Sequence, residues 1–330
     1  MNAKNSIKIA ASEYNLIFKI LLYDLIVYLV IFATAAAILA PGISILAGKV
    51  AGLQILENIN AVISEILAGS VNIADKVDAM YASFDALGVI IKESYWVLNE
   101  VYVIGTAAFF VLRFLINLRT IPVSGVINAK MSSNTKYGFS SNLISNLGKS
   151  AKFSLALLVV QLPVDIILAV FTFLIVGPLF NVFGILAPIL IVTMIIALVS
   201  FKDALLFEWV PSIVVDNSRT WKSFNSSIKC AFSHFGEIYG VLVLLRLFSL
   251  VLIMIMTVFS FGVGLFIALP IGTIILRALE MVFYYDKRKL RYYTDGSRDV
   301  VTPDGAVTED QGGAAVVAVK KSINTEDDEE

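Results

Sequence analysis

The feature that most constrains this chain is a series of apolar runs, each about twenty residues long. A helix of about 20 residues, rising about 1.5 Å per residue, matches the roughly 30 Å hydrocarbon core of a bilayer. Hydrophobic residues make up 58% of the chain and charged residues 15%, whereas an ordinary soluble domain has about 45–50% and about 25%. The sequence therefore predicts an all-α, polytopic transmembrane helical bundle.

Six spans are expected from the apolar runs and the helix-ending residues between them. Pro41-Gly42 closes the first run, and Gly177-Pro178 divides a run too long for one helix, because proline cannot easily continue a helix. The uncharged stretch between Arg246 and Arg277 is one overlong span or a hairpin. The hairpin is preferred, since it leaves both arginines near one interface. The predicted spans are residues 16–40, 95–118, 153–176, 182–201, 238–258 and 263–284.

The first run also allows another interpretation, a cleaved secretory signal, because Lys4 and Lys8 precede it. A signal usually has an apolar core of about 7–15 residues, and this run is longer and contains Asp24, so a span is preferred. Basic connections favour the cytoplasm. Residues 119–152 hold five basic and no acidic residues, whereas residues 41–94 hold three lysines and six acids. We therefore expect a multi-pass protein of the cell membrane with both termini cytoplasmic.

Two segments outside the spans have their own character. Apolar residues recur every three or four positions in residues 43–93, which predicts an amphipathic helical hairpin outside the membrane. This hairpin either packs on itself or the outer membrane face, or offers a groove to a protein partner. Residues 294–330 are rich in acidic and small residues, which predicts a disordered cytoplasmic tail that could also bind a basic partner.

The two longer cytoplasmic connections resemble each other. Ile121-Pro122 leads to Phe139–Asn142, and Val210-Pro211 leads to Phe224–Ser227. Each connection then runs into a new span. The pattern suggests that one unit, consisting of a span, a cytoplasmic helix and a second span, is used twice.

Ionisable residues inside the spans are the candidate functional groups, because a charge in a membrane requires a structural or functional reason. Matched depths suggest an ion pair between Asp24 and Arg246, and Arg277 can pair with Glu280 one helical turn away. Two explanations fit the arginines inside the spans: their side chains snorkel to the headgroups, or they line an inward-opening polar cavity. Asp165 follows Pro163 and could handle protons or cations, or serve helix packing. The candidate polar cluster is Asp24, Arg113, Asp165, Arg246, Arg277 and Glu280.

Signals for a soluble enzyme are missing from the sequence, which contains none of the common phosphate-binding, hydrolase or metalloprotease motifs. A single cysteine, Cys230, and a single histidine, His234, argue against a zinc site. We therefore expect no catalytic residues, no cofactor and no metal. The formal net charge of −1 argues against a nucleic-acid partner.

Two short segments carry a resemblance to a known group. Trp209-Val210-Pro211-Ser212-Ile213-Val214-Val215-Asp216 and Phe283-Tyr284-Tyr285-Asp286-Lys287-Arg288 resemble a broad group of six-span bacterial and archaeal proteins. That group is similar to the membrane domain sometimes attached to glycerophosphodiester phosphodiesterases, and the likeness covers roughly residues 121–291. The catalytic phosphodiesterase domain has no counterpart here, and the connection of residues 41–94 departs from the group. The resemblance therefore implies an architecture and no activity.

These observations favour a non-enzymatic scaffold or accessory protein that contacts membrane lipids, or a protein partner through residues 43–93 or the acidic tail. The alternative is a small transporter or channel-like protein with an inward-facing polar cavity that uses the candidate charges. A membrane-embedded enzyme acting on lipids comes third, because it would need converging nucleophiles or metal ligands.

Overall fold

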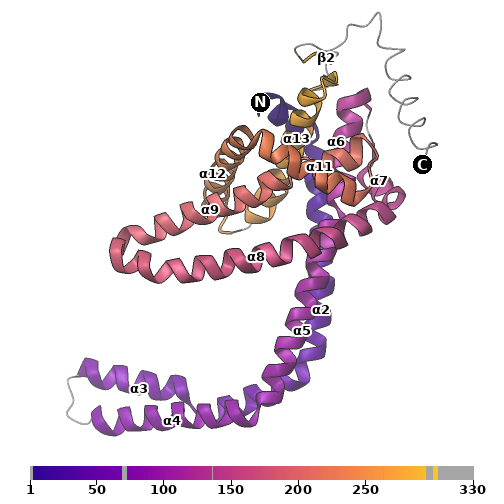
Figure 1. Ribbon diagram of the computed structural model, residues 1–330. Helices are drawn as coiled ribbons and strands as arrows, with labels where there is room; N and C mark the ends of the chain where they lie inside the picture. The colour runs from indigo at the N-terminus through magenta and orange to yellow at the C-terminus, as the bar shows by residue number, and fades with distance from the viewer. Residues whose placement is uncertain (1–2, 69–72, 136, 263, 295–299, 304–330) are drawn as a thin grey trace, which may run out of the picture. The chain divides into compact units, whose positions relative to one another are not determined.

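The computed structural model describes residues 3–68, 73–135, 137–262, 264–294 and 300–303, and these are almost wholly helical. The all-α prediction is confirmed. In chain order the elements are α1 Ala3–Ser12, α2 Tyr14–Ala51, α3 Ile55–Ala68, α4 Ile73–Glu93, α5 Tyr95–Leu118, α6 Thr120–Ser133, α7 Phe139–Ser145, α8 Leu147–Phe183, the 3₁₀ helix η1 Gly184–Leu186, α9 Ala187–Leu205, α10 Trp209–Val215, α11 Thr220–Ser233, α12 Phe235–Phe259, α13 Gly264–Lys287, β1 Tyr292–Tyr293 and β2 Val300–Val301 (Figure 1).

Six helical segments are long and apolar enough to cross a membrane, as the sequence predicts. The chain divides into a smaller unit, Asp24–Leu115, and a larger unit, Met1–Tyr23 with Ile116–Glu330. The division falls inside α2 and inside α5.

The smaller unit contains a helical hairpin of α3 and α4, which pack against each other (Figure 1). Asn58 Nδ2 donates a hydrogen bond of 2.8 Å to Ser83 Oγ, and Val62 of α3 is buried. Lys49 at the end of α2 forms an exposed ion pair with Glu93 at the end of α4. Helices therefore form within the predicted stretch 43–93, but they begin at Ile55.

The first predicted span ends too early. Helix α2 continues through Pro41 as far as Ala51, and the chain leaves helical geometry at Gln54, whose φ is +50°. A proline removes one backbone hydrogen bond, whereas ending the helix would free several carbonyl and N–H groups. In a segment this apolar, the smaller loss is preferred.

The predicted turn at Gly177-Pro178 is also wrong, for the same reason. Helix α8 runs through Pro163 and Pro178, and the turn comes at Gly184, where φ is +49°. Glycine adopts this left-handed conformation without the steric cost of a side chain. The hairpin predicted for the last two spans is confirmed, because α12 ends at Phe259 and α13 begins at Gly264 and packs against it.

The tightest packing of the larger unit lies outside the most apolar stretches of most spans. We call this region the junction core: it comprises α1, α6, α7, α10 and α11, the first turns of α8 and the last turns of α13. Its largest buried side chains include Ile9, Ile127, Met131, Phe153, Trp209 and Tyr284. Trp209 packs against Phe153 and Phe224, with ring centroids 5.1 and 4.9 Å apart.

The two connections that look alike in sequence adopt the same order of structure. Helix α6 and helix α10 each follow a span, and each is followed by a left-handed asparagine, Asn134 with φ +50° and Asn217 with φ +54°. The helices α7 and α11 come next and lead into α8 and α12. Helices α6 and α10 contact each other. This arrangement agrees with the predicted repeat.

The segment after α13 differs in part from the predicted tail. Val300–Val301 pairs with Tyr292–Tyr293 as a short antiparallel ribbon, and Asn5 Nδ2 donates a 3.0 Å hydrogen bond to Tyr292 Oη. Burial raises the pKa of the Tyr292 hydroxyl to about 12, so this group stays neutral at ordinary pH. The rest of the predicted tail, residues 295–299 and 304–330, lies outside the described residues.

Candidate functional site

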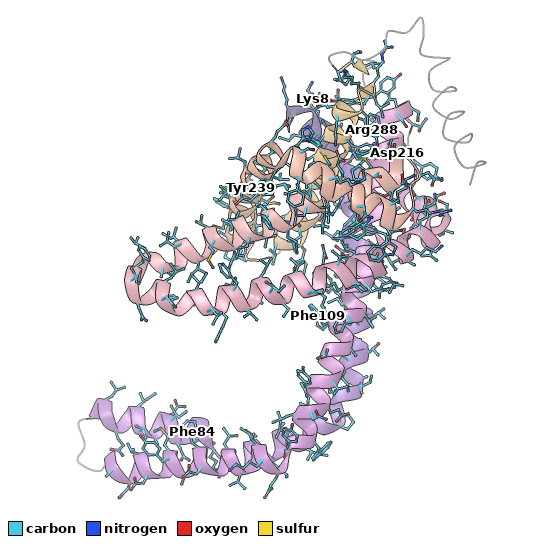
Figure 2. The ribbon with its side chains drawn as sticks, in the orientation of Figure 1. Lys8, Phe84, Phe109, Asp216, Tyr239 and Arg288 are labelled. Carbon is cyan, nitrogen blue, oxygen red and sulfur yellow. The ribbon has the colours of Figure 1, made fainter. Side chains whose placement is uncertain are left out.

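The two segments that carry the resemblance meet in the junction core. Asp216, at the end of α10, accepts a 2.5 Å hydrogen bond from Tyr284 Oη and a 3.0 Å bond from an Arg288 nitrogen. Arg288 also donates to Tyr284 Oη at 3.2 Å. Figure 2 labels Asp216 and Arg288, which lie side by side where α10 and α13 end. The three side chains form a charged triangle that joins these two helix ends.

A second contact joins the end of α13 to the start of α10 and to α11. Lys287 Nζ lies 3.0 Å from Glu208 Oε1 and 2.8 Å from Cys230 Sγ, and the Glu208 side chain is only 4% exposed. Burial, together with the neighbouring Glu208 carboxylate and against the effect of Lys287, raises the pKa of the Cys230 thiol to about 11. A thiol held neutral in this way is a poor nucleophile. The cluster is therefore suited to holding helices together.

Buried serines form hydrogen bonds that join α11 to α10 and to the end of α9. Ser212 Oγ donates to Ser223 Oγ at 3.2 Å, and Ser227 Oγ donates to the carbonyl of Leu205 at 3.0 Å while accepting from the backbone N–H of Glu208. Trp209 Nε1 donates to the carbonyl of Thr220 at 2.8 Å. Small hydroxyl side chains let the two helices approach closely while satisfying backbone groups that burial would otherwise leave without partners.

Among the candidate charges, Arg277 and Glu280 form the predicted local pair, with two nitrogen–oxygen distances of 2.9 and 2.6 Å. Arg246 has a partner that the sequence does not predict. Its guanidinium contacts the carboxylate of Asp203 at the end of α9, and the expected pair with Asp24 stays a prediction. Matched depth along two helices puts two residues at the same height in the membrane but does not say which helices are neighbours. Helix α9, which carries Asp203, packs against α12, which carries Arg246. Asp203 and Arg246 are also within electrostatic range of Glu280.

The other candidates have separate surroundings. Asp165 on α8 forms an ion pair of 2.8 Å with Lys202 on α9. Asp24 and Arg113 belong to the smaller unit, where the Arg113 guanidinium lies 5.8 Å from the centre of the Phe109 ring. The structure therefore brings Arg246, Arg277 and Glu280 together and gives Asp165 its own partner.

Sequence reasoning missed several residues of these contacts: Lys202, Asp203, Glu208, Asp216, Lys287 and Arg288. They lie at helix ends, where a charge is unremarkable in a sequence. One signal was present, because charged residues end both segments of the resemblance. The ring of His234, the lone histidine, packs edge-on against that of Phe283, with 6.2 Å between the ring centroids.

A polar pocket of about 240 Å³ lies in the junction core, between α6, α7, α10 and the start of α8. Its polar lining consists of Asn128, Tyr137, Asn142, Asn146 and Lys149. Within the part of the chain that the structure describes, no three His, Cys, Asp or Glu side chains gather as a metal site would require.

No family model, curated protein or solved structure matches the chain. The likeness to the membrane domain associated with glycerophosphodiester phosphodiesterases stays a prediction.

Proposed function

We propose that this chain is a non-enzymatic membrane scaffold or accessory protein, which presents apolar span surfaces to lipids and to partner helices. The observation that carries the proposal is the contrast in burial between the junction core and five of the six candidate spans in the described residues; α13, half of whose apolar window is buried, is the exception. In the most apolar stretch of α8 no residue is buried, and in that of α12 the buried share is 6%. In the junction core, by contrast, Trp209 is 0% exposed and Tyr284 is 1% exposed. A chain folded in this way holds its shape through the junction core and leaves span surfaces available.

The surface between α8 and α9 supports the same proposal. A crevice of about 500 Å³ runs between them, and its lining is apolar apart from Asp165 and Thr172. Apolar side chains of this lining such as Phe173, which is 82% exposed, need lipid or protein to cover them. We also propose that the protein lies in the cell membrane, and the basic residues of 119–152 support cytoplasmic termini there.

A small transporter is the second candidate, and the clustered ion pairs of the larger unit favour it. The pairs Asp165–Lys202, Asp203–Arg246 and Arg277–Glu280 lie on α8, α9, α12 and α13. Charges along a substrate path are expected to be open to water, whereas charges that hold helices together are satisfied by one another. The two roles therefore differ in hydration.

Hydration can be measured by labelling single cysteines in a Cys230→Ser background. Ser200→Cys tests the buried face of α9, and Ser249→Cys tests the turn of α12 next to Arg246. Ser141→Cys, on the exposed surface of α7, is the matched control. A scaffold predicts that a water-soluble maleimide labels only the control. Labelling of all three at similar rates would favour a transporter and contradict the proposal.

Partner contact is tested separately by a photoactivatable residue on α8. Phe173 and Val159 face outward, at 82% and 65% exposed, whereas Leu157 is 7% exposed and serves as the buried control. In native membranes a scaffold should give a discrete protein adduct from the exposed positions and none from Leu157. Lipid adducts alone would restrict the role to lipid contact.

A further inference from the structure

The polar pocket of the junction core is assembled from four separate helices. Gly125 and Asn128 come from α6, Asn142 from α7 and Lys149 from the first turn of α8, while α10 supplies apolar wall. Three asparagines and a lysine around so small a space are unusual for a region otherwise filled with apolar and aromatic side chains. Asn142 is buried, Asn128 and Asn146 are half-buried and Lys149 is exposed, so the pocket opens to the surface at Lys149. A buried amide carries a desolvation cost unless a partner satisfies it, so a ligand or water in the pocket would stabilise Asn142.

The oxygen atoms of two of these amides are already occupied by the protein. Asn128 Oδ1 accepts a 2.7 Å hydrogen bond from Tyr285 Oη, and Asn142 Oδ1 accepts a 2.5 Å bond from Asn146 Nδ2. An asparagine has one acceptor oxygen and one NH₂ group that donates. Each oxygen keeps a second lone pair, but an anion takes only donors, so Asn128 and Asn142 would offer it their NH₂ groups. The pocket is consequently rich in donors.

Asn142 is held in place by a specific feature of the sequence. Its side chain is only 3% exposed, and its NH₂ group packs against α6 at Gly125, where a Cβ atom would overlap Asn142 Nδ2. Glycine inside a helix costs about 1 kcal/mol relative to alanine. The close approach of the amide explains why the helix contains a glycine at this position.

The charge of the lining points to an anion. Lys149 is the one charged residue among those that line the pocket, and its ammonium is positioned by a 2.6 Å hydrogen bond to Asn217 Oδ1, which uses one of its three protons. No carboxylate lines the pocket among the described residues. The nearby Asp216 is engaged by Arg288 and Tyr284.

We propose that this pocket binds a phosphate group, with the NH₂ groups of Asn128 and Asn142 donating to its oxygens and Lys149 providing the opposite charge. Phosphate oxygens accept several hydrogen bonds at once, and a bond to a charged oxygen is about twice as strong as a neutral one. The group is supplied either by the headgroup of an anionic phospholipid or by a soluble phosphate. This site does not depend on the scaffold role.

The experiment uses the full chain and two sources of phosphate. In nanodiscs of equal phosphatidylglycerol and phosphatidylcholine, native mass spectrometry measures which lipid is retained. In nanodiscs of phosphatidylcholine alone, thermal melting is followed with inorganic phosphate and with chloride at equal ionic strength. The variants are Lys149→Gln and Asn142→Asp. Lys229→Gln, an exposed lysine of α11, is the control with the same change of charge.

We expect both pocket variants to weaken binding by at least about tenfold, since each removes a charge-assisted contact, and the control to bind like the original chain. Retention of phosphatidylglycerol alone identifies a lipid headgroup, and stabilisation by inorganic phosphate alone identifies a soluble ligand. Neither effect in the original chain would overturn the proposal. An equal loss in Lys229→Gln would also overturn it, because binding would then follow net charge. If Asn142→Asp fails to fold, Lys149→Gln decides the outcome.

Discussion

The ion pair of Lys287 with Glu208 allows a quantitative prediction. The Glu208 side chain is 4% exposed and that of Lys287 is 33% exposed, with 3.0 Å between Nζ and Oε1. Lys287→Met keeps the apolar stem and removes the ammonium, so a buried carboxylate loses its cation. Such a loss costs about 3–5 kcal/mol in a fully buried pair. Because water reaches a third of Lys287, we expect a cost of about 2–3 kcal/mol in the free energy of unfolding.

The reverse change should cost less. Glu208→Gln leaves a lysine that can turn towards water, so we expect a loss of about 1 kcal/mol. The double variant leaves no buried charge, and should be more stable than Lys287→Met alone. The assay is unfolding in mixed micelles of dodecyl maltoside and increasing dodecyl sulfate, followed by circular dichroism, with the exposed Lys229→Met as control. Costs that add in the double variant, or a larger cost for Glu208→Gln, would refute the reasoning.

Three further predictions concern the junction core. Trp209→Ala should lower the free energy of unfolding by about 3–5 kcal/mol, because it leaves a cavity and removes the donor to the Thr220 carbonyl. Trp221 is 54% exposed, so Trp221→Ala should cost less than about 1 kcal/mol in the same unfolding assay. Gly125→Ala should destabilise the fold by about 1–3 kcal/mol despite alanine's higher helix propensity, since its Cβ overlaps the amide of Asn142; a stabilised variant would contradict the close approach. Cys230 should alkylate at least about 100-fold more slowly at pH 8 in the folded chain than in dodecyl sulfate, because its pKa rises from 9.0 to about 11, and folding stability should fall as pH rises above the pKa of the unfolded thiol; equal rates would refute its burial.

The spans could be predicted from the sequence because length and apolarity alone decide them. The prediction for residues 95–118 agrees with α5, and the hairpin of α12 and α13 forms at the expected glycine-containing turn. Errors occurred at Pro41 and Pro178, where a rule drawn from soluble helices was applied to apolar segments. There the backbone has no water to bond, so a helix with one missing hydrogen bond is preferred to a break.

The partners of the charges were harder to predict. The pair Arg277–Glu280 is local, so helical spacing alone identifies it. The pairs of Arg246 with Asp203 and of Asp216 with Arg288 join residues 43 and 72 positions apart. Such contacts depend on which helices pack together, and a pattern of apolar runs contains no information about that choice. The pocket around Asn142 was missed for the same reason.

The uneven packing of the larger unit has a consequence for how a protein of this kind would change in evolution. Where the outward faces of α8 and α12 contact lipid and no partner, they need only remain apolar, so leucine, isoleucine, valine and phenylalanine can replace one another there at little cost to folding. The hydrogen-bonded residues of the junction core, such as Ser212, Asp216 and Tyr284, tolerate far fewer changes. We therefore expect descendants of a common ancestor to keep a few scattered polar positions while most of their sequence diverges.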